Sequence, residues 1–392
     1  MQGLIDSTLR EGEQAVGVRF SLVEKISIFR MLVQMGVEEI EIGLAAEYRQ
    51  IADLCQYCRG SKKNSRIALW SRCRSDDIAA AARMRPDVLS LSVPVSDLHL
   101  RQRLRRDRKW AVTAMQESIR EARAAGIQYI SIGFEDATRA DLSFLELLAE
   151  TASTAGAHRI RLADTVGTAT PAQIQQLVDR LKRTAPLAIG VHAHNDFGMA
   201  TANTIAALEA GAEWGDVTVL GLGERAGMAR LEEVAGFLTL RDNRPRYRAD
   251  LLRPLTTLVA RLTNRAVGPH HPVVGEEIFA CETGLHLQGL LREPSTYEPF
   301  DPQLVGNRRQ LLFGAKVGRG AVAELLTGQE VPPPLATALL ARRIHLQAHA
   351  LQRPLNMIEA ARLTGPGQEK ASAAKGQERP ENLIALEATS HP

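Results

Sequence analysis

The sequence has little of several features that mark particular classes of protein. Four cysteines in 392 residues are too few for a disulfide framework and fit a reducing compartment. Lysine and arginine number 48 against 45 aspartates and glutamates, a net charge of only +3, which argues against a surface built for nucleic acid. No apolar run is long enough to cross a bilayer, and the first residues lack the pattern of a signal peptide. We therefore expect a cytoplasmic globular protein without nucleic-acid or membrane partners.

The first 240 residues alternate between two apolar patterns. Short β-branched runs are typical of buried parallel strands and are predicted at Gly3–Leu9, Val37–Gly43, Arg66–Ser71, Val88–Val93, Tyr129–Phe134, Arg159–Ala163, Ala188–Ala193 and Asp216–Leu222. Helical spacing follows each run, at Ser21–Met35, Ala46–Cys58, Asp76–Met84, Lys109–Ala125, Asp141–Ala155, Pro171–Thr184, Met199–Ala210 and Leu231–Leu240. An open doubly wound sheet could show the same alternation. Eight even units in this length favour a closed (β/α)8 TIM barrel.

The pattern changes after residue 250, and a chain of 392 residues is too long for one compact core of ordinary size. We predict a TIM-barrel domain over residues 1–250 and a smaller, mostly helical C-terminal subdomain over 251–364. Residues 365–392 are polar and rich in Ala, Glu and Lys. Such a segment buries too little apolar surface to fold, so we predict a disordered tail.

Polar side chains cluster where two predicted strands end. The first strand runs into acidic and basic residues, and the seventh ends in His192-Ala193-His194. Residues two apart on a strand face the same side, so His192 and His194 project together. An acid at the end of strand one can meet both imidazoles at the mouth of a barrel. Two imidazoles and a carboxylate would make a metal site with open positions, although an isolated His-x-His pair more often serves hydrogen bonding alone.

Four stretches in the same order resemble the DRE-TIM metallolyases: Asp6–Gln14, Ala163–Gly167, His192–Asp196 and Gly221–Arg225. That superfamily contains isopropylmalate, citramalate and homocitrate synthases and hydroxymethylglutaryl-CoA lyase. The resemblance covers the whole predicted barrel and continues to about Gly318. It implies a metal-dependent TIM-barrel enzyme.

Within this superfamily the sequence is most similar to the homocitrate synthases. Glu11 stands where most relatives have Asp, and Leu220 and Met228 stand where isopropylmalate-type enzymes show Asn. Pro94–Leu98 and Glu135–Leu142 resemble the enzymes associated with nitrogenase, and a role in lysine synthesis stays open. The resemblance implies an acyltransferase that condenses acetyl-CoA with 2-oxoglutarate and then hydrolyses the thioester to give homocitrate and CoA.

The resemblance also implies roles for residues at the barrel mouth. Glu11, His192 and His194 would hold a divalent metal ion, for which zinc, manganese, iron and magnesium all remain candidates. The ion would chelate the 2-oxo acid and polarise its ketone. Arg10 would stabilise negative charge on oxygen, or could instead form a structural ion pair with Glu224 or another barrel acid.

By the same resemblance, Glu135, His286 and Tyr297 form the acid/base set, and which of them takes the proton from acetyl-CoA stays open. His286 and Tyr297 belong to a segment that reaches over a partner's barrel in the family, which implies a homodimer with shared sites. Taken alone, His286 is more often a hydrogen-bonded structural histidine and Tyr297 a packing residue.

Three further residues are predicted to bind substrate. Arg101 aligns with the arginine that holds the far carboxylate of the 2-oxo diacid in homocitrate synthases, and Arg72, at the end of strand three, is the other candidate. Most of the basic run Arg101–Lys109 fits a solvated loop. Thr165, at the end of strand six, could hydrogen-bond a substrate carboxylate or merely order its turn.

Two departures from the family motifs leave alternatives open. Cys281 stands where relatives usually have His, and Gly314–Gly318 replaces the Gly-Lys-His-Ser-Gly of many relatives. One alternative is an isopropylmalate or citramalate synthase acting on another 2-oxo acid. The other is a catalytically inactive, metal-binding regulatory paralogue. An active synthase is favoured because the motif residues are all present, namely Arg10, Glu11, Glu135, His192, His194, His286 and Tyr297.

Overall fold

The computed structural model describes residues 3–241, 245–326 and 334–363. The chain divides into two compact units. Unit 1 comprises Met1–Phe279 and Glu298–Arg309, and unit 2 comprises Ala280–Tyr297 and Gln310–Pro392. This division reflects contacts rather than independent folding, so the domain limits 1–250 and 251–364 stay predictions. The tail predicted at 365–392 lies outside the described residues.

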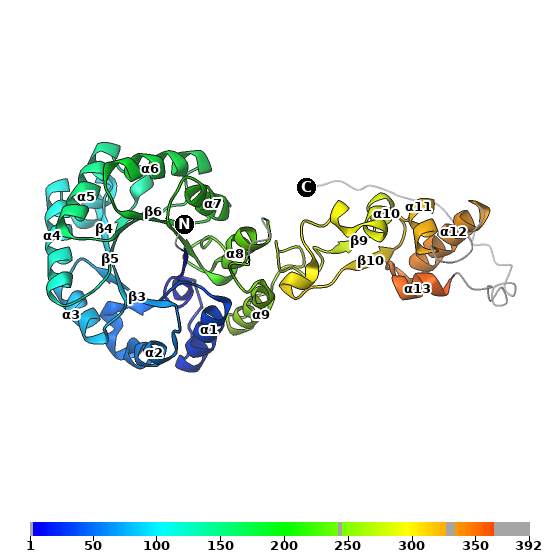
Figure 1. Ribbon diagram of the computed structural model, residues 1–392, viewed down its shortest axis with the longest axis horizontal. Helices are drawn as coiled ribbons and strands as arrows, with labels where there is room; N and C mark the ends of the chain where they lie inside the picture. The colour runs from blue at the N-terminus through cyan, green and yellow to red at the C-terminus, as the bar shows by residue number, and fades with distance from the viewer. Residues whose placement is uncertain (1–2, 242–244, 327–333, 364–392) are drawn as a thin grey trace, which may run out of the picture. The chain divides into compact units, whose positions relative to one another are not determined.

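Unit 1 contains a closed barrel of eight parallel strands, paired in chain order with β8 returning to β1. The strands are β1 Gly3–Asp6, β2 Glu39–Leu44, β3 Arg66–Arg72, β4 Val88–Pro94, β5 Ile130–Glu135, β6 Arg159–Asp164, β7 Ala188–Ala193 and β8 Trp214–Val217. A ring of helices surrounds them (Figure 1): α1 Leu22–Met35, α2 Tyr48–Ser61, α3 Ser75–Met84, α4 Arg108–Ala124, α5 Leu142–Ala155, α6 Pro171–Thr184, α7 Ala200–Glu209 and α8 Leu231–Leu240. The predicted (β/α)8 TIM barrel is confirmed.

Several helix boundaries follow capping residues that the sequence displays. Ser21 and Glu24 form a capping box at the start of α1, and Gly36 ends that helix in the left-handed conformation with φ of 92°. Thr170 caps α6 through another capping box, directly before Pro171 at the first helical position. These local interactions satisfy backbone groups at the helix ends, so the boundaries lie close to those predicted.

The eighth strand differs from its prediction. It covers Trp214–Val217 rather than Asp216–Leu222. The chain leaves the sheet after Val217, and Leu220 adopts a left-handed conformation with φ of 60° that no strand contains. The carboxylate of Glu232 accepts a hydrogen bond from the Leu220 backbone N–H at 3.1 Å. This side-chain contact from α8 replaces the ladder hydrogen bond that the apolar pattern had suggested.

Charged residues, rather than only branched apolar ones, fill part of the barrel interior. Arg159 on β6 reaches across to Glu39 on β2 with nitrogen–oxygen distances of 2.6 and 3.1 Å, and both side chains are fully buried. Two residues further along the same strands, Arg161 pairs with Glu41 at 3.0 Å. Interior side chains alternate along strands, so the two pairs form successive layers. The second layer is the one nearer to the carboxyl-terminal mouth.

Short helical turns connect the main elements. They are η1 Gly12–Gln14, η2 Ala45–Glu47, η4 Ala137–Arg139, η5 Val219–Gly221, η6 Ala249–Leu251, η7 Pro294–Thr296, η8 Pro302–Val305 and one π-helical turn, η3 His99–Leu104. Helix α9 (Leu252–Leu262) also belongs to unit 1. No helix in the described part of the chain is both long and apolar enough to cross a membrane.

Unit 2 is small and mostly helical, as predicted for the C-terminal part. It has a three-stranded sheet in the order β11-β10-β9. Its core is apolar and includes Leu287, Phe313 and Ile344. The elements are β9 Ala280–Cys281, α10 Gly284–Arg292, β10 Gln310–Phe313, α11 Arg319–Leu325, α12 Pro334–Leu351, β11 Leu355–Asn356 and α13 Met357–Arg362.

Candidate metal centre and active site

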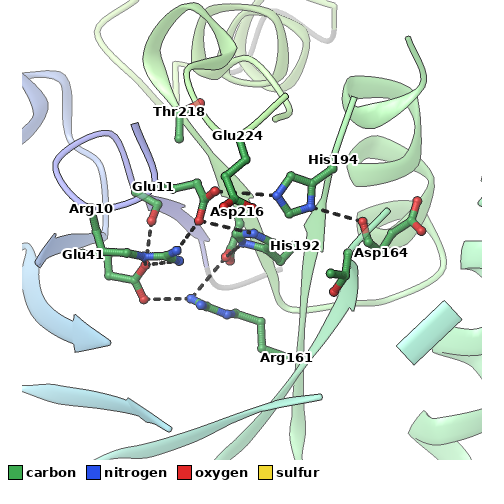
Figure 2. A network of polar contacts seen from close by, with 12 residues as sticks. Arg10, Glu11, Glu41, Arg161, Asp164, His192, His194, Asp216, Thr218 and Glu224 are labelled. Carbon is green, nitrogen blue, oxygen red and sulfur yellow. Dashed lines mark hydrogen bonds and ion pairs between the residues drawn. The ribbon is translucent and has the colours of Figure 1, made fainter. Parts of the chain in front are cut away.

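The three predicted metal ligands meet at the mouth of the barrel (Figure 2). Glu11 follows β1, His192 lies on β7, and His194 comes directly after that strand. One ligand atom from each lies within 4.8 Å of the others, and all three residues are buried. Nε2 of His194 lies 3.6 Å from one Glu11 oxygen, and Nε2 of His192 lies 4.0 Å from the other. The geometry that the sequence predicted is therefore present.

The far side of each imidazole is already held. Nδ1 of His192 lies 2.7 Å from a carboxylate oxygen of Asp216, and Nδ1 of His194 donates to the backbone carbonyl of Asp164 at 3.2 Å. Nε2 of His194 is buried and has no hydrogen-bond partner among the described residues. Metal-binding histidines characteristically use one ring nitrogen for such a partner and the other for the ion. An unpartnered nitrogen beside a carboxylate fits a divalent cation.

The protonation states also suit metal binding. Burial alone would raise the pKa of Glu11, but the adjacent Arg10 guanidinium and the two imidazoles hold that pKa well below its usual range. Burial lowers the pKa of His192, although Asp216 opposes this shift. The site thus favours a carboxylate and a neutral imidazole, which are the forms that bind metal.

Arg10 is held by two acids, neither of them the Glu224 considered from the sequence. It pairs with Glu11, and its Nε donates to Glu41 at 2.6 Å. Burial would raise the pKa of Glu41, but the guanidinium groups of Arg10 and Arg161 bring it down to about 2. Arg161 also lies 3.2 Å from the carboxylate that orients His192. One charged layer therefore supports Arg10 and a metal ligand together (Figure 2).

The loop after β8 holds the chain around His194 in place. The backbone N–H of Asn195 donates to the carbonyl of Gly227 at 2.8 Å, and Gly227 donates to the carbonyl of Glu224 at 2.8 Å. Gly227 has a φ of 83°, and a Cβ added there would lie 1.8 Å from the backbone oxygen of Gly221. Only glycine allows so close an approach. The glycine-rich motif therefore holds the backbone beside His194, the second of the two candidate histidine ligands.

A cavity of about 210 Å³ opens at the metal site. Predicted residues in its wall are Arg10, Glu11, Glu135, Thr165, His192 and His194. The sequence interpretation assigned no catalytic, binding or metal role to the others, which are Gln14, Trp70, Ser92, Arg103, Gly133, Arg161, Ala163 and Glu224. For Arg161 a signal existed, because the alternation of Arg159 and Arg161 along a strand predicts two guanidinium groups on one face. Neither Leu220 nor Met228 lines this cavity.

Glu135, at the end of β5, and Thr165, directly after the neighbouring strand β6, both line the cavity, but they differ in their capacity to bind a ligand. The Thr165 hydroxyl accepts a hydrogen bond from the Asp136 N–H at 2.8 Å and keeps its own hydrogen to donate. Glu135 is paired with Arg103 through both oxygens, at 2.7 and 2.9 Å. Nδ1 of His99 lies 3.1 Å from the same carboxylate. Thr165 can thus donate to a ligand, whereas Glu135 already has partners.

The two arginines predicted to hold the far carboxylate do not line this cavity. The side chain of Arg101 is 71% exposed and lies 3.4 Å from Asp97. Arg72 is held by both oxygens of Asp77, at 2.7 and 3.0 Å. It lines an adjoining hollow, which shares with the cavity Trp70, Ser92, Arg103 and Glu135. Their substrate-binding role stays a prediction.

His286 and Tyr297 come together within unit 2. Their ring centroids are 4.1 Å apart with an angle of 34° between the planes. Gly289 permits this packing, because a Cβ at that position would lie 2.6 Å from the Tyr297 ring. The two residues form one cluster on and beside α10, as a joint role requires. Their participation in proton transfer stays a prediction.

Comparison with known proteins decides the family. The family model described as HMGL-like matches residues 2–259. The chain belongs to the HMGL-like family. A second model, described as homocitrate synthase post-HMGL domain-like, matches residues 273–333. The resemblance to the DRE-TIM metallolyases is thereby confirmed, and the divalent metal that the family implies agrees with the three-ligand site.

Curated relatives of this HMGL-like chain are enzymes that share most of its length. A homocitrate synthase of Frankia alni is 44% identical over 81% of the chain and 90% of the relative. A protein named 2-isopropylmalate synthase 2, from Caldanaerobacter subterraneus subsp. tengcongensis, is 37% identical over 90% of the chain and 92% of the relative. The chain is accordingly an enzyme, as the sequence predicted.

Solved structures support the fold. The HMG-CoA lyase of Bacillus subtilis matches with a TM-score of 0.59 at 18% identity, covering 68% of this chain and 94% of the lyase. An HMG-CoA lyase from Acinetobacter baumannii matches with a TM-score of 0.60 at 21% identity, covering 68% and 92%. Both share the TIM-barrel architecture of this HMGL-like chain.

Proposed function

We propose that this enzyme condenses acetyl-CoA with 2-oxoglutarate and releases homocitrate and CoA. The observation that carries the proposal is the buried cluster of Glu11, His192 and His194, with an unpartnered Nε2 on His194. Relatives named homocitrate synthase, 44% and 42% identical, support the choice of substrates. The isopropylmalate and citramalate synthases among the relatives support the same reaction type on other 2-oxo acids.

The residues at the barrel mouth would activate the 2-oxo acid. A divalent cation held by Glu11, His192 and His194 would polarise the ketone as a Lewis acid. Arg10 presents its guanidinium in the cavity wall, where negative charge would develop on oxygen, and its pairs with Glu11 and Glu41 fix its position. Such pre-oriented charge stabilises a transition state without reorganisation.

Other residues would orient the substrate and move the proton. The free hydroxyl hydrogen of Thr165 can be donated to the carboxylate beside the ketone. We assign proton transfer to Glu135, which lies in the cavity wall, together with His286 and Tyr297. In this proposal the chain works as a homodimer in the cytoplasm, and the partner subunit supplies the last two residues.

A second candidate is isopropylmalate or citramalate synthesis from another 2-oxo acid. The relative named 2-isopropylmalate synthase 2 favours it, since that match spans more of the chain than the homocitrate synthase match does. The shared site geometry serves either reaction. The two candidates differ only in the acceptor, so one assay separates them.

The test is release of free CoA from acetyl-CoA by the full-length protein with added divalent metal. Acceptors are 2-oxoglutarate, 2-oxoisovalerate and pyruvate, each compared with no acceptor and with a chelator. We expect 2-oxoglutarate to give the highest kcat/KM and homocitrate as the product found by mass spectrometry. Preference for either monocarboxylic acceptor would refute the homocitrate assignment. Full metal occupancy with no CoA release on any acceptor would favour an inactive paralogue.

A further inference from the structure

One residue of the basic run Arg101–Lys109 reaches the cavity at the metal site. That residue is Arg103, on the π-helical turn η3. The sequence alone had predicted Arg101 and Arg72 as the cationic anchors, but neither lines this cavity. π-Helical segments often occur at functional sites. Arg103 is therefore a cation that the structure, and not the sequence interpretation, places in the cavity wall.

Three arginines line the cavity, and they differ in burial and in the number of carboxylates that hold their guanidinium groups. Arg10 is buried between Glu11 and Glu41. Arg161 is buried and lies within 3.2 Å of carboxylates on two other strands. The Arg103 side chain is 50% exposed, and among the residues that the structure describes its one ion pair is with Glu135. Of the three, Arg103 is the one that can change partners at small cost, because ion pairs at half-exposed positions contribute little net stability.

We propose that Arg103 binds the second carboxylate of a dicarboxylic 2-oxo acid by exchanging it for the carboxylate of Glu135. The inference rests on the proposed function and names the residue that selects the substrate class. Arg103 already holds Glu135 through both oxygens, so its guanidinium is presented in the orientation that a carboxylate ligand needs. A monocarboxylic acid offers no group for the exchange and leaves the pair closed.

The exchange also changes the state of Glu135. In the structure Nδ1 of His99 lies 3.1 Å from the Glu135 carboxylate, so His99 offers Glu135 a partner in the cavity wall when substrate engages Arg103. His99 is itself placed between Asp136, at 3.8 Å, and Arg139, at 3.4 Å. Glu135 then loses the guanidinium that occupies both of its oxygens, so an oxygen becomes available to face the bound substrate. Recognition of the diacid is thereby coupled to release of a group assigned to proton transfer.

The test uses Arg103→Met in the full-length, metal-loaded protein. Calorimetry measures the binding of 2-oxoglutarate and of 2-oxobutyrate, a monocarboxylic analogue, without acetyl-CoA. We expect Arg103→Met to weaken 2-oxoglutarate binding by about 10- to 100-fold, in the range of losing one charged hydrogen-bonding partner. Binding of 2-oxobutyrate should stay within about 2-fold, which also shows that the variant is folded. Arg103→Lys keeps the charge but not the two-pronged geometry and should be intermediate.

Two matched variants sharpen the result. Arg106→Met removes the same charge from the same run, outside the cavity, and should bind both acids as the wild type does. Arg101→Met tests the competing residue. The inference is overturned if Arg101→Met shows the selective loss, if Arg103→Met weakens both acids equally, or if it weakens neither.

Failure of the proposed function has a different signature. Wild-type protein that releases CoA with a monocarboxylic acceptor but not with 2-oxoglutarate refutes the homocitrate assignment and the diacid selection together. Wild-type protein that turns over 2-oxoglutarate, and an Arg103→Met variant that does so equally well, preserve the function and overturn only the role of Arg103.

Discussion

Two buried polar clusters in the barrel differ in whether their hydrogen-bonding atoms have partners. In the lower layer, Arg159 and Glu39 are fully buried and meet through two hydrogen bonds. At the mouth, His194 is also buried, yet its Nε2 has no hydrogen-bond partner among the residues described. A buried ion pair with matched partners holds strands together, whereas a buried ligand atom without one is ready to bind an ion. The lower pair uses its charges on each other, whereas the mouth leaves an imidazole nitrogen beside a carboxylate, at 3.6 Å, where an ion can bind both.

An intermediate layer joins the two. Arg161 contacts Glu41 and Asp216, and Asp216 in turn orients His192. Alternation along the strands stacks these residues above the lower pair. A substitution can therefore address one layer at a time, and the expected effect is on the free energy of unfolding for the lower pair and on metal affinity for the residues above it.

The largest effect on stability should come from breaking the lower pair. Glu39→Gln leaves Arg159 buried with an uncompensated charge, so the barrel should lose about 3–5 kcal/mol of its free energy of unfolding. Urea denaturation followed by tryptophan fluorescence reports on the barrel, because Trp70, Trp110 and Trp214 all lie in unit 1. Asp250→Asn, in the exposed pair with Arg248, is the control and should change little. Equal stability of Glu39→Gln and wild type would contradict this account of the scaffold.

His194→Ala, at the mouth of the barrel, should weaken metal binding strongly and affect the free energy of unfolding less than Glu39→Gln does. Removing one of three ligands should weaken metal binding by more than about 100-fold, the upper range seen for merely indirect partners of a metal site. The metal-free variant should lose less stability than Glu39→Gln, since it gives up one hydrogen bond, from Nδ1 of His194 to the Asp164 carbonyl, and leaves Glu11 paired with Arg10. Metal content after dialysis and the urea midpoint together test this. Retained stoichiometric metal would remove His194 from the site.

Asp216→Asn tests the intermediate layer, which lies between the Arg159–Glu39 pair and the mouth. The amide keeps the shape but loses the negative charge beside His192 and Arg161. Metal affinity should fall by about 10- to 100-fold, as expected for a residue that orients a ligand. Competition with a chromogenic chelator measures it. Unchanged affinity would show that the His192 orientation does not depend on this carboxylate.

A further test concerns Asp6, at the end of β1, and reads the pH dependence of stability rather than its value at one pH. Burial raises its pKa to about 7, despite two hydrogen bonds from Thr8. Between about pH 4 and 7 the folded protein keeps a proton that the unfolded chain releases, so stability falls as pH rises, by at most about 1.4 kcal/mol per pH unit. Asp6→Asn should lack this component. Stability curves measured from pH 4 to 8 that run parallel for variant and wild type would contradict the shifted pKa.

Much of the barrel and its metal centre was predictable because both depend on local periodicity. The His192-x-His194 spacing fixes two side chains on one face of a strand, and chain order brings the Glu11 loop near them. Arg101 and Arg103 show where this reasoning stops. They stand two residues apart in one basic run, but the π-helical turn sends Arg103 into the cavity and leaves Arg101 exposed.

The sequence by itself predicted the eight strand–helix units through apolar periodicity, the family through its motifs, and Glu11, His192 and His194 as candidate metal ligands. Only the tertiary structure decided that Arg159 meets Glu39 across the barrel, 120 residues away, and that Arg103 meets Glu135 in the cavity wall. Such pairings depend on barrel closure and on the conformation of one turn. No local pattern encodes them.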